Sequence, residues 1–154
     1  MSMIEKRLAE LGISLPQAAK PVANYVPWVV TGKLVFVAGQ IPLKDGKPVA
    51  VGQVPVAVSL EEAAAAARVC AINILAQLKD ACGGDLDRVA RIVKLTGFVN
   101  CGAAFTDIPK VVNGASDLMV EVFGDKGKHA RAAVGSSSLP LGVPVEVEAV
   151  VELA

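Results

Sequence analysis

The amino-acid sequence predicts an α+β fold in which two long helices cover one face of a sheet. Apolar residues recur with the helical period over residues 59–82 and again over residues 107–123. Over residues 145–153 they instead alternate with mostly acidic residues, which is the period of a half-buried strand. Further strand-like segments precede, separate and follow the two helices, so all the strands are expected to share one core with both helices.

A short amphipathic helix is predicted over residues 2–12. Ser2 and Glu5 have the S-x-x-E spacing of a capping box, and an apolar residue recurs on one face of the segment. Gly12 is suited to end this helix. Residues 13–24 contain two prolines and are expected to form an extended arm.

A β-hairpin is predicted next, with strands over residues 25–30 and 34–38. Both segments are rich in valine and aromatic residues, and Thr31, Gly32 and Lys33 join them. The proline-marked residues 47–58 are expected to be extended.

A long helix over residues 59–82 is indicated by a second capping box at Ser59 and Glu62 and by the terminating pair Gly83 and Gly84. Many of its apolar residues are small, so we expect it to lie tightly against a sheet. One predicted apolar stripe comprises Leu60, Ala64, Ala67, Ala71, Leu75, Leu78 and Cys82, and a second comprises Ala65, Val69, Ile72 and Ala76.

The remaining segments complete the predicted sheet. A strand over residues 89–99 precedes a helix that Thr106 or Asp107 can cap and that has Pro109 in its first turn. A charged turn follows, and then a strand over residues 131–135, a loop over 136–144 and a strand over 145–153. We therefore expect residues 1–21 to form an amino-terminal helix and arm, and residues 22–154 to form one domain.

Composition narrows the possible functions of the 154-residue chain. Lysine plus arginine and aspartate plus glutamate each total 15, and aromatic residues make up 4%. This neutral balance argues against a nucleic-acid-binding protein. The hydrophobic share is 53% against 19% charged residues, an excess that predicts buried interfaces between subunits. The charged start and the lack of a long uncharged segment lead us to expect a cytoplasmic protein.

Metal and disulfide sites are not expected. The chain has three widely spaced cysteines, Cys70, Cys82 and Cys101, and a single histidine, and it contains no C-x-x-C pair. We expect the cysteines to be reduced core residues. No cofactor is implied.

Two groups of polar residues are candidates for chemistry. Arg131 follows a local positive cluster, and its guanidinium could bind a carboxylate through two N–H groups or could form an ordinary salt bridge at a strand edge. Glu146 and Glu148 lie on one side of the last strand, where they could hold a water molecule or form a solvated face. His129 is more typical of a structural residue, and Ser136 to Ser138 of a polar loop, because no G-x-S-x-G elbow is present.

Several stretches share their sequence with one known family. They are Tyr25, residues 32–42 with Gly-Gln-Ile-Pro, residues 93–99, Val112-Asn113, residues 130–134 with Leu139-Pro140, and residues 145–149. Together they resemble the YjgF/Rid proteins, which are reactive-intermediate imine deaminases also known as the endoribonuclease L-PSP family. The resemblance covers roughly residues 22–154.

This resemblance implies a chorismate-mutase-like fold that assembles as a homotrimer, with ligand clefts between neighbouring subunits. It also implies hydrolysis of 2-imino or 2-enamino acids to 2-keto acids and ammonia. By the same resemblance, Arg131 binds the substrate carboxylate and Glu146 positions the attacking water. Tyr25 and Gly39 line the pocket, and Asn113 lies near it.

The sequence departs from the family pattern in three places. Ala133 stands where the family often has cysteine, although its backbone could still contact a ligand. Ser136 to Ser138 replace a bulkier charged stretch, and the amino-terminal helix and an insertion around residues 43–58 indicate a longer subgroup. Three functions stay open: imine deamination, binding of a small carboxylate by a non-catalytic trimer, and RNA cleavage or inhibition of translation. The neutral charge and few aromatic residues count against the last.

Overall fold

Three α-helices and seven strands make up the computed structural model, which describes residues 1–154. The helices are α1 (Met3–Glu10), α2 (Leu60–Ala81) and α3 (Ile108–Phe123). The strands are β1 (Trp28–Thr31), β2 (Leu34–Gln40), β3 (Leu43–Lys44), β4 (Lys47–Pro48), β5 (Val89–Asn100), β6 (Ala130–Ser136) and β7 (Val145–Leu153). Short 3₁₀ turns lie at Leu86–Arg88, Gly124–Gly127 and Pro140–Gly142.

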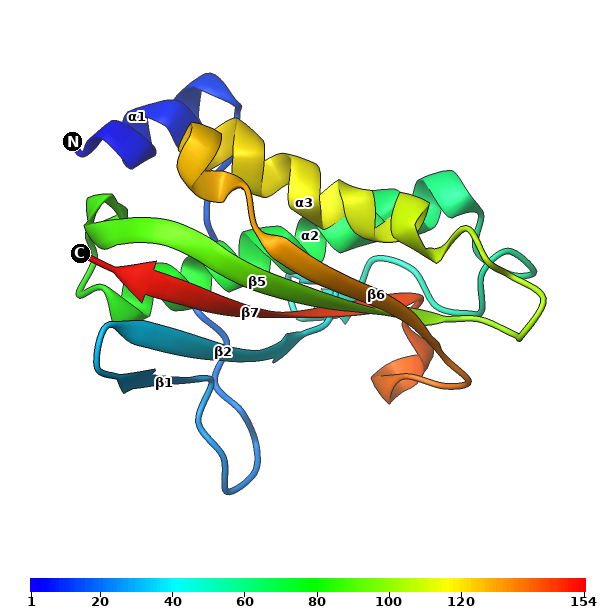
Figure 1. The fold of residues 1–154 in the computed structure, drawn as a ribbon. Helices are drawn as coiled ribbons and strands as arrows, with labels where there is room; N and C mark the ends of the chain where they lie inside the picture. Colours follow the sequence, from blue (N-terminus) through cyan, green and yellow to red (C-terminus); the bar gives the residue numbers. More distant parts are fainter.

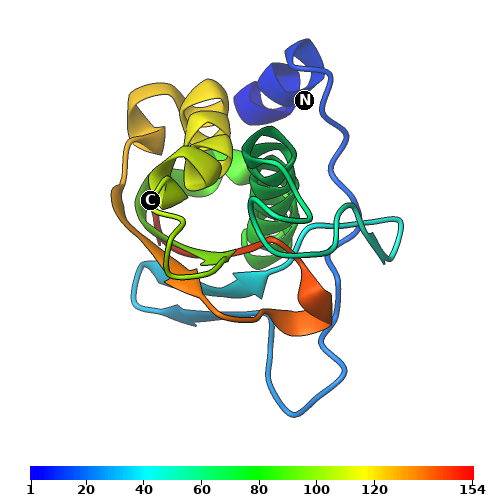
Figure 2. The ribbon, with the colours of Figure 1, turned by 90° about the vertical axis from the view of Figure 1, so that its right-hand side faces the viewer.

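Five of the strands form a mixed sheet in the order β1-β2-β7-β5-β6, and β3 pairs with β4 in a separate hairpin. Only β5 and β6 run parallel, and β6 is an edge strand whose other side pairs with nothing in the chain. Helices α2 and α3 lie side by side over one face of the sheet, and no helix covers the other face (Figures 1 and 2). The predicted α+β fold is thereby confirmed.

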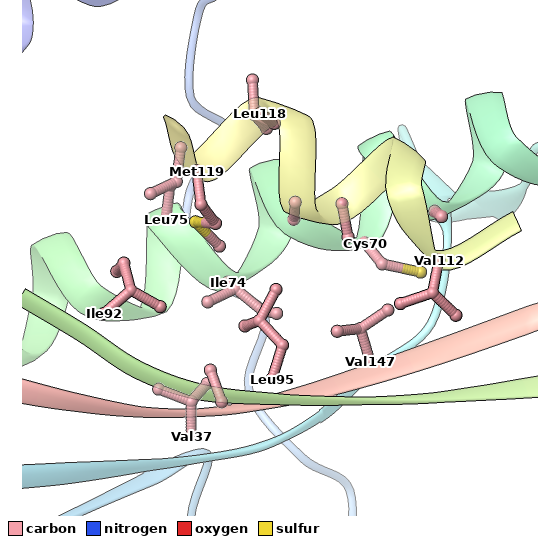
Figure 3. Close-up of a cluster of buried hydrophobic side chains, with 14 of the residues drawn as sticks. Val37, Cys70, Ile74, Leu75, Ile92, Leu95, Val112, Leu118, Met119 and Val147 are labelled. Atoms are coloured by element: carbon pink, nitrogen blue, oxygen red, sulfur yellow. The ribbon is translucent and has the colours of Figure 1, made fainter. Parts of the chain in front are cut away.

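The hydrophobic core fills the space between this helix pair and the sheet (Figure 3). Ile74 of α2, Met119 of α3 and Leu95 of β5 are all fully buried there. On β7 every second residue, such as Val145 and Val147, points into this core. The intervening glutamates therefore lie on the helix-free face, as the alternating pattern predicts.

Both predicted capping boxes form the expected amino-terminal hydrogen bonds. Ser2 Oγ accepts from the Glu5 amide and Ser59 Oγ accepts from the Glu62 amide, each at 3.1 Å. The third helix differs, because Asp107 occupies the N-cap position without a side-chain hydrogen bond to the helix. Its carboxylate instead pairs with Lys110 at 3.5 Å.

The buried face of α2 is rotated from the predicted second stripe. Ala65 is exposed, and Val69 and Ile72 are only half-buried. Ala63 and Cys70 are fully buried instead, because α2 packs against α3 as well as against the sheet. All three cysteines are buried and unpaired, as expected.

The amino-terminal helix lies on the outer surface of the helix pair (Figure 2). The amides of Met3 and Ile4 donate to the carboxylate of Asp87 at 3.0 and 2.9 Å, and Arg7 Nε donates to the Glu121 carbonyl at 2.8 Å. None of the helices combines the length and the apolar character that crossing a membrane requires.

The first strand begins later than predicted, at Trp28. Its indole N–H donates to the Asp80 carboxylate at 3.0 Å and thereby ties β1 to α2. Tyr25 lies before the strand, with 59% of its surface exposed.

Candidate active site

Arg131 lies on the edge strand β6 and points toward the helices. It stands opposite the buried Leu95 in the parallel β5–β6 register, so both side chains project from the helix-covered face. Its Nη1 donates to Asn113 Oδ1 at 2.8 Å and to Ser116 Oγ at 3.2 Å. Helix α3 therefore supplies both protein partners of the guanidinium.

The guanidinium of Arg131 has no acidic partner. No carboxylate forms an ion pair with it, so the salt bridge that the sequence left open is absent. The two hydrogens of Nη1 account for both bonds to α3, whereas Nε and Nη2 donate to no group in the chain. The Nε–Nη2 edge is the side-by-side pair of donors that fits a carboxylate.

Ala133 lies on the same side of β6 as Arg131, two residues further along the strand. It is opposite Gly97 of β5 and packs partly buried against the core. A Cβ on Gly97 would come within 2.5 Å of the Val112 side chain, so glycine lets α3 approach the sheet here. The wall beside the arginine is consequently small and apolar.

Glu146 lies on the helix-free face of the sheet, on β7 opposite Phe98. A Cβ on Gly39 of β2 would overlap the Glu146 carboxylate, so the glycine makes room for the acid. Burial raises the pKa of Glu146, and the nearby charge of Glu148 raises that pKa further. Glu146 therefore holds a proton more readily than an exposed glutamate.

A cavity of about 400 Å³ lies beside Gly39. Tyr25, Gln40, Asn73 and Leu141 contribute to its lining together with the carboxyl-terminal part of the arm. The Asn73 amide donates to the carbonyls of residues 41 and 43 at 3.1 Å and fixes the segment that follows Gly39.

The structure thus divides the predicted site residues into two groups. Arg131, Asn113 and Ala133 lie on the side of the sheet that the helices cover. Glu146 lies beside Gly39 on the opposite side, and Tyr25 lines the neighbouring cavity. A single chain does not bring the arginine and the glutamate together.

Sequence reasoning grouped His129 only with the positive cluster that precedes Arg131, and it did not single out Ser116. Ser116 Oγ lies 2.9 Å from His129 Nε2 and also accepts from Arg131. Asn113 and Ser116 are three residues apart and so share one face of α3, which is the signal that could have linked them. Ser136 ends β6, and its hydroxyl donates only to the Ser138 carbonyl, at 2.7 Å, in agreement with the polar-loop interpretation of these serines.

The helix-free face of the sheet is apolar as well as open. Val29, Phe36 and Val134 project from it and are 50%, 45% and 44% exposed. Exposed apolar side chains spread over three strands are typical of an interface with another protein surface.

Comparison with known proteins identifies the family. The model of the family described as "YjgF/chorismate_mutase-like, putative endoribonuclease" matches residues 5–153. The chain belongs to the YjgF/Rid family.

Three similar proteins illustrate the relationship of this YjgF/Rid chain to known ones. Protein TCP17 of Trypanosoma cruzi is 48% identical over 97% of the chain and 94% of its own length. A protein of unknown function from Agrobacterium tumefaciens is also 48% identical, and its crystal structure matches 98% of this chain and 92% of its own with a TM-score of 0.92. TdcF of E. coli, solved with bound serine, shares the fold at 24% identity, with 90% and 94% of the two chains covered and a TM-score of 0.65.

Proposed function

We propose that this YjgF/Rid protein hydrolyses small 2-imino or 2-enamino acids to 2-keto acids and ammonia. The observation that carries the proposal is the guanidinium of Arg131, which has no acidic partner and leaves its Nε–Nη2 edge free. A cation held by neutral side chains alone retains its full attraction for an anion. A carboxylate bound to that edge would hold the rest of a small substrate at a fixed place beside β6.

Once the substrate is bound, hydrolysis of its imine needs only water and a group that carries protons. The oxygen of water attacks the electrophilic imine carbon while a general base takes one water proton and delivers it to the imine nitrogen, which gives a carbinolamine. The base then takes the proton of the carbinolamine hydroxyl and delivers it to the amino group as the C–N bond breaks, so that ammonia leaves and a C=O bond remains. Glu146 is the proposed proton carrier, because its raised pKa makes its carboxylate a stronger base than that of an exposed glutamate.

The complete site requires two subunits under this proposal. Arg131 and Glu146 lie on opposite faces of one sheet, so the arginine of one subunit must meet the glutamate of a neighbour. The open edge of β6 and the apolar helix-free face support such an assembly. We propose a homotrimer, in keeping with the family resemblance.

The deciding experiment mixes purified protein with freshly generated 2-aminoacrylate and follows the formation of pyruvate. We expect acceleration by the wild type and a loss of at least about 100-fold in Arg131→Ala, because a charged hydrogen-bonded anchor is removed. Lys110→Ala, which removes an exposed cation at the start of α3, is the matched control and should retain activity. No acceleration by the wild type, or full activity of Arg131→Ala, would refute the proposal.

A second candidate function is binding of a small carboxylate without turnover. The separation of Arg131 and Glu146 within one chain favours it, because the arginine alone suffices to bind an anion. Calorimetry with serine and pyruvate, alongside the pyruvate assay, distinguishes the two functions. Binding that depends on Arg131 but is accompanied by no hydrolysis would establish the second.

A further inference from the structure

We propose that His129 is a positioning residue for Arg131 and acts on it through the hydroxyl of Ser116. In this arrangement the imidazole fixes the direction of the serine hydroxyl, and the serine oxygen fixes the plane of the guanidinium. The inference rests on the proposed function only for the identity of the group that the free arginine edge binds.

The surroundings of the His129 ring determine which nitrogen carries the proton. Nδ1 lies 2.7 Å from the carbonyl oxygen of Gly127, which can only accept a hydrogen bond. Nδ1 must therefore be the donor. In the neutral ring Nε2 is then an acceptor, and it lies 2.9 Å from Ser116 Oγ.

The direction of the remaining hydrogen bonds follows from this tautomer. Ser116 donates its hydroxyl hydrogen to His129 Nε2, which leaves the lone pairs of the serine oxygen facing Arg131. Nη1 of Arg131 donates to that oxygen at 3.2 Å. The chain of hydrogen bonds therefore runs from Arg131 through Ser116 and His129 to the backbone at Gly127, with one donor and one acceptor at each step.

Two acceptors are needed to orient the guanidinium. Asn113 Oδ1 occupies one hydrogen of Nη1 at 2.8 Å, and the second hydrogen requires Ser116. With both hydrogens bound, the planar guanidinium can present only its Nε–Nη2 edge outward. With Asn113 alone, the group can turn about the remaining bond.

The first test is spectroscopic and does not depend on any activity. The chain contains a single histidine, so its ring resonances in a ¹H–¹⁵N spectrum need no assignment. At alkaline pH, where imidazoles are neutral, we expect the Nδ1–H tautomer in the wild-type protein. We also expect slowed rotation of the Arg131 guanidinium, and faster rotation in Ser116→Ala.

The second test uses two replacements of the histidine that retain different halves of its ring. His129→Asn places an amide N–H near Nδ1 and keeps the bond to Gly127 but has no atom near Ser116. His129→Gln places an amide oxygen near Nε2 and keeps an acceptor for Ser116. Asp117→Asn, an exposed neighbour of Ser116 without a side-chain hydrogen bond, is the matched control.

The measurement is the dissociation constant for pyruvate. We expect it to rise about fivefold in His129→Asn and in Ser116→Ala, which corresponds to one lost hydrogen bond. It should rise no further in the double variant, because both changes break one chain. His129→Gln should restore affinity to within about twofold of the wild type, which a purely structural role for the histidine would not produce.

Failure of this inference is distinguishable from failure of the proposed function. An Nε2–H tautomer, or guanidinium rotation that is equally fast in wild type and Ser116→Ala, overturns the positioning role. Equal pyruvate affinities of the asparagine and glutamine variants overturn it as well. A wild type that shows the expected tautomer and slow rotation but binds pyruvate without hydrolysing 2-aminoacrylate refutes only the deaminase activity.

Discussion

At the scale of single residues, Glu146 is a carboxyl group whose pKa the fold raises. Its pKa is raised from the ordinary 4.5 because the side chain is half-buried and Glu148 lies nearby. The folded protein therefore disfavours the charged form more than the unfolded chain does. This cost is absent below the ordinary pKa, grows as the pH rises above it, and is complete above the raised pKa of the folded state.

Replacing Glu146 with glutamine should thus stabilise the protein at neutral pH but not in acid. We expect the difference in free energy of unfolding between Glu146→Gln and wild type to grow as the pH rises above 4.5, measured by urea unfolding at a series of pH values. Glu148→Gln should make this rise smaller and end it at a lower pH, since it removes the second cause of the raised pKa. A pH-independent difference would contradict the raised pKa.

At the scale of elements, the crossing of α2 and α3 depends on Gly114. A Cβ at this position would overlap the carbonyl oxygen of Ala64 on α2. The two helix backbones therefore approach more closely than any side chain would allow. This contact sets the spacing of the helix layer, and Asn113 and Ser116 lie on either side of it along α3.

Gly114→Ala should destabilise the protein even though alanine is the better helix former. Alanine ordinarily gains about 0.5–1 kcal/mol over glycine within a helix. Here the enforced separation of α2 and α3 should cost about 1–3 kcal/mol, which outweighs that gain. Urea unfolding of Gly114→Ala checks this, with Asp117→Ala on the exposed side of α3 expected to change stability by less than about 0.5 kcal/mol. A Gly114→Ala protein as stable as the wild type would show that the helices separate freely.

The elements that the sequence predicted well are those governed by local chemistry. Ser59 with its capping box and the alternation along β7 specify a helix start and a strand without reference to distant residues. The buried face of α2, which includes Ala63, was less predictable, because this helix packs against α3 as well as against the sheet. The capping role expected of Asp107 was also hard to predict. Its carboxylate pairs with Lys110 and not with the helix amides.

At the scale of the whole molecule, the helix-free face should be an interface between subunits. Phe36 projects from it and is 45% exposed, so a charge there would be buried on assembly. We expect the wild type to be a trimer and Phe36→Glu a monomer when their masses are measured by light scattering. Val56→Glu, at a residue 89% exposed in a loop, should leave the assembly intact. A monomeric wild type would contradict the expectation.

The candidate site could be predicted only in part, because it depends on how distant strands pair in the whole molecule. The alternation along β7 is by itself enough to assign Glu146 to the face opposite the core. The side on which Arg131 projects depends on its pairing with Leu95, which is 36 positions away in the chain (131 minus 95). No periodicity within residues 130–136 specifies that register. Only the three-dimensional structure therefore shows that Arg131 and Glu146 lie on opposite faces of the sheet.

Under the proposed assembly, the unpaired edge of β6 would link ligand affinity to protein concentration. The strand that carries Arg131 also offers a row of free backbone N–H and C=O groups to a neighbouring chain. An anion that touches both neighbours would bind the assembled form alone and would therefore draw free chains into it by mass action. By reciprocity, dilution that dissociates the chains would weaken the hold on the anion to the same extent. The concentration of the metabolite and the extent of self-association would in this way depend on each other.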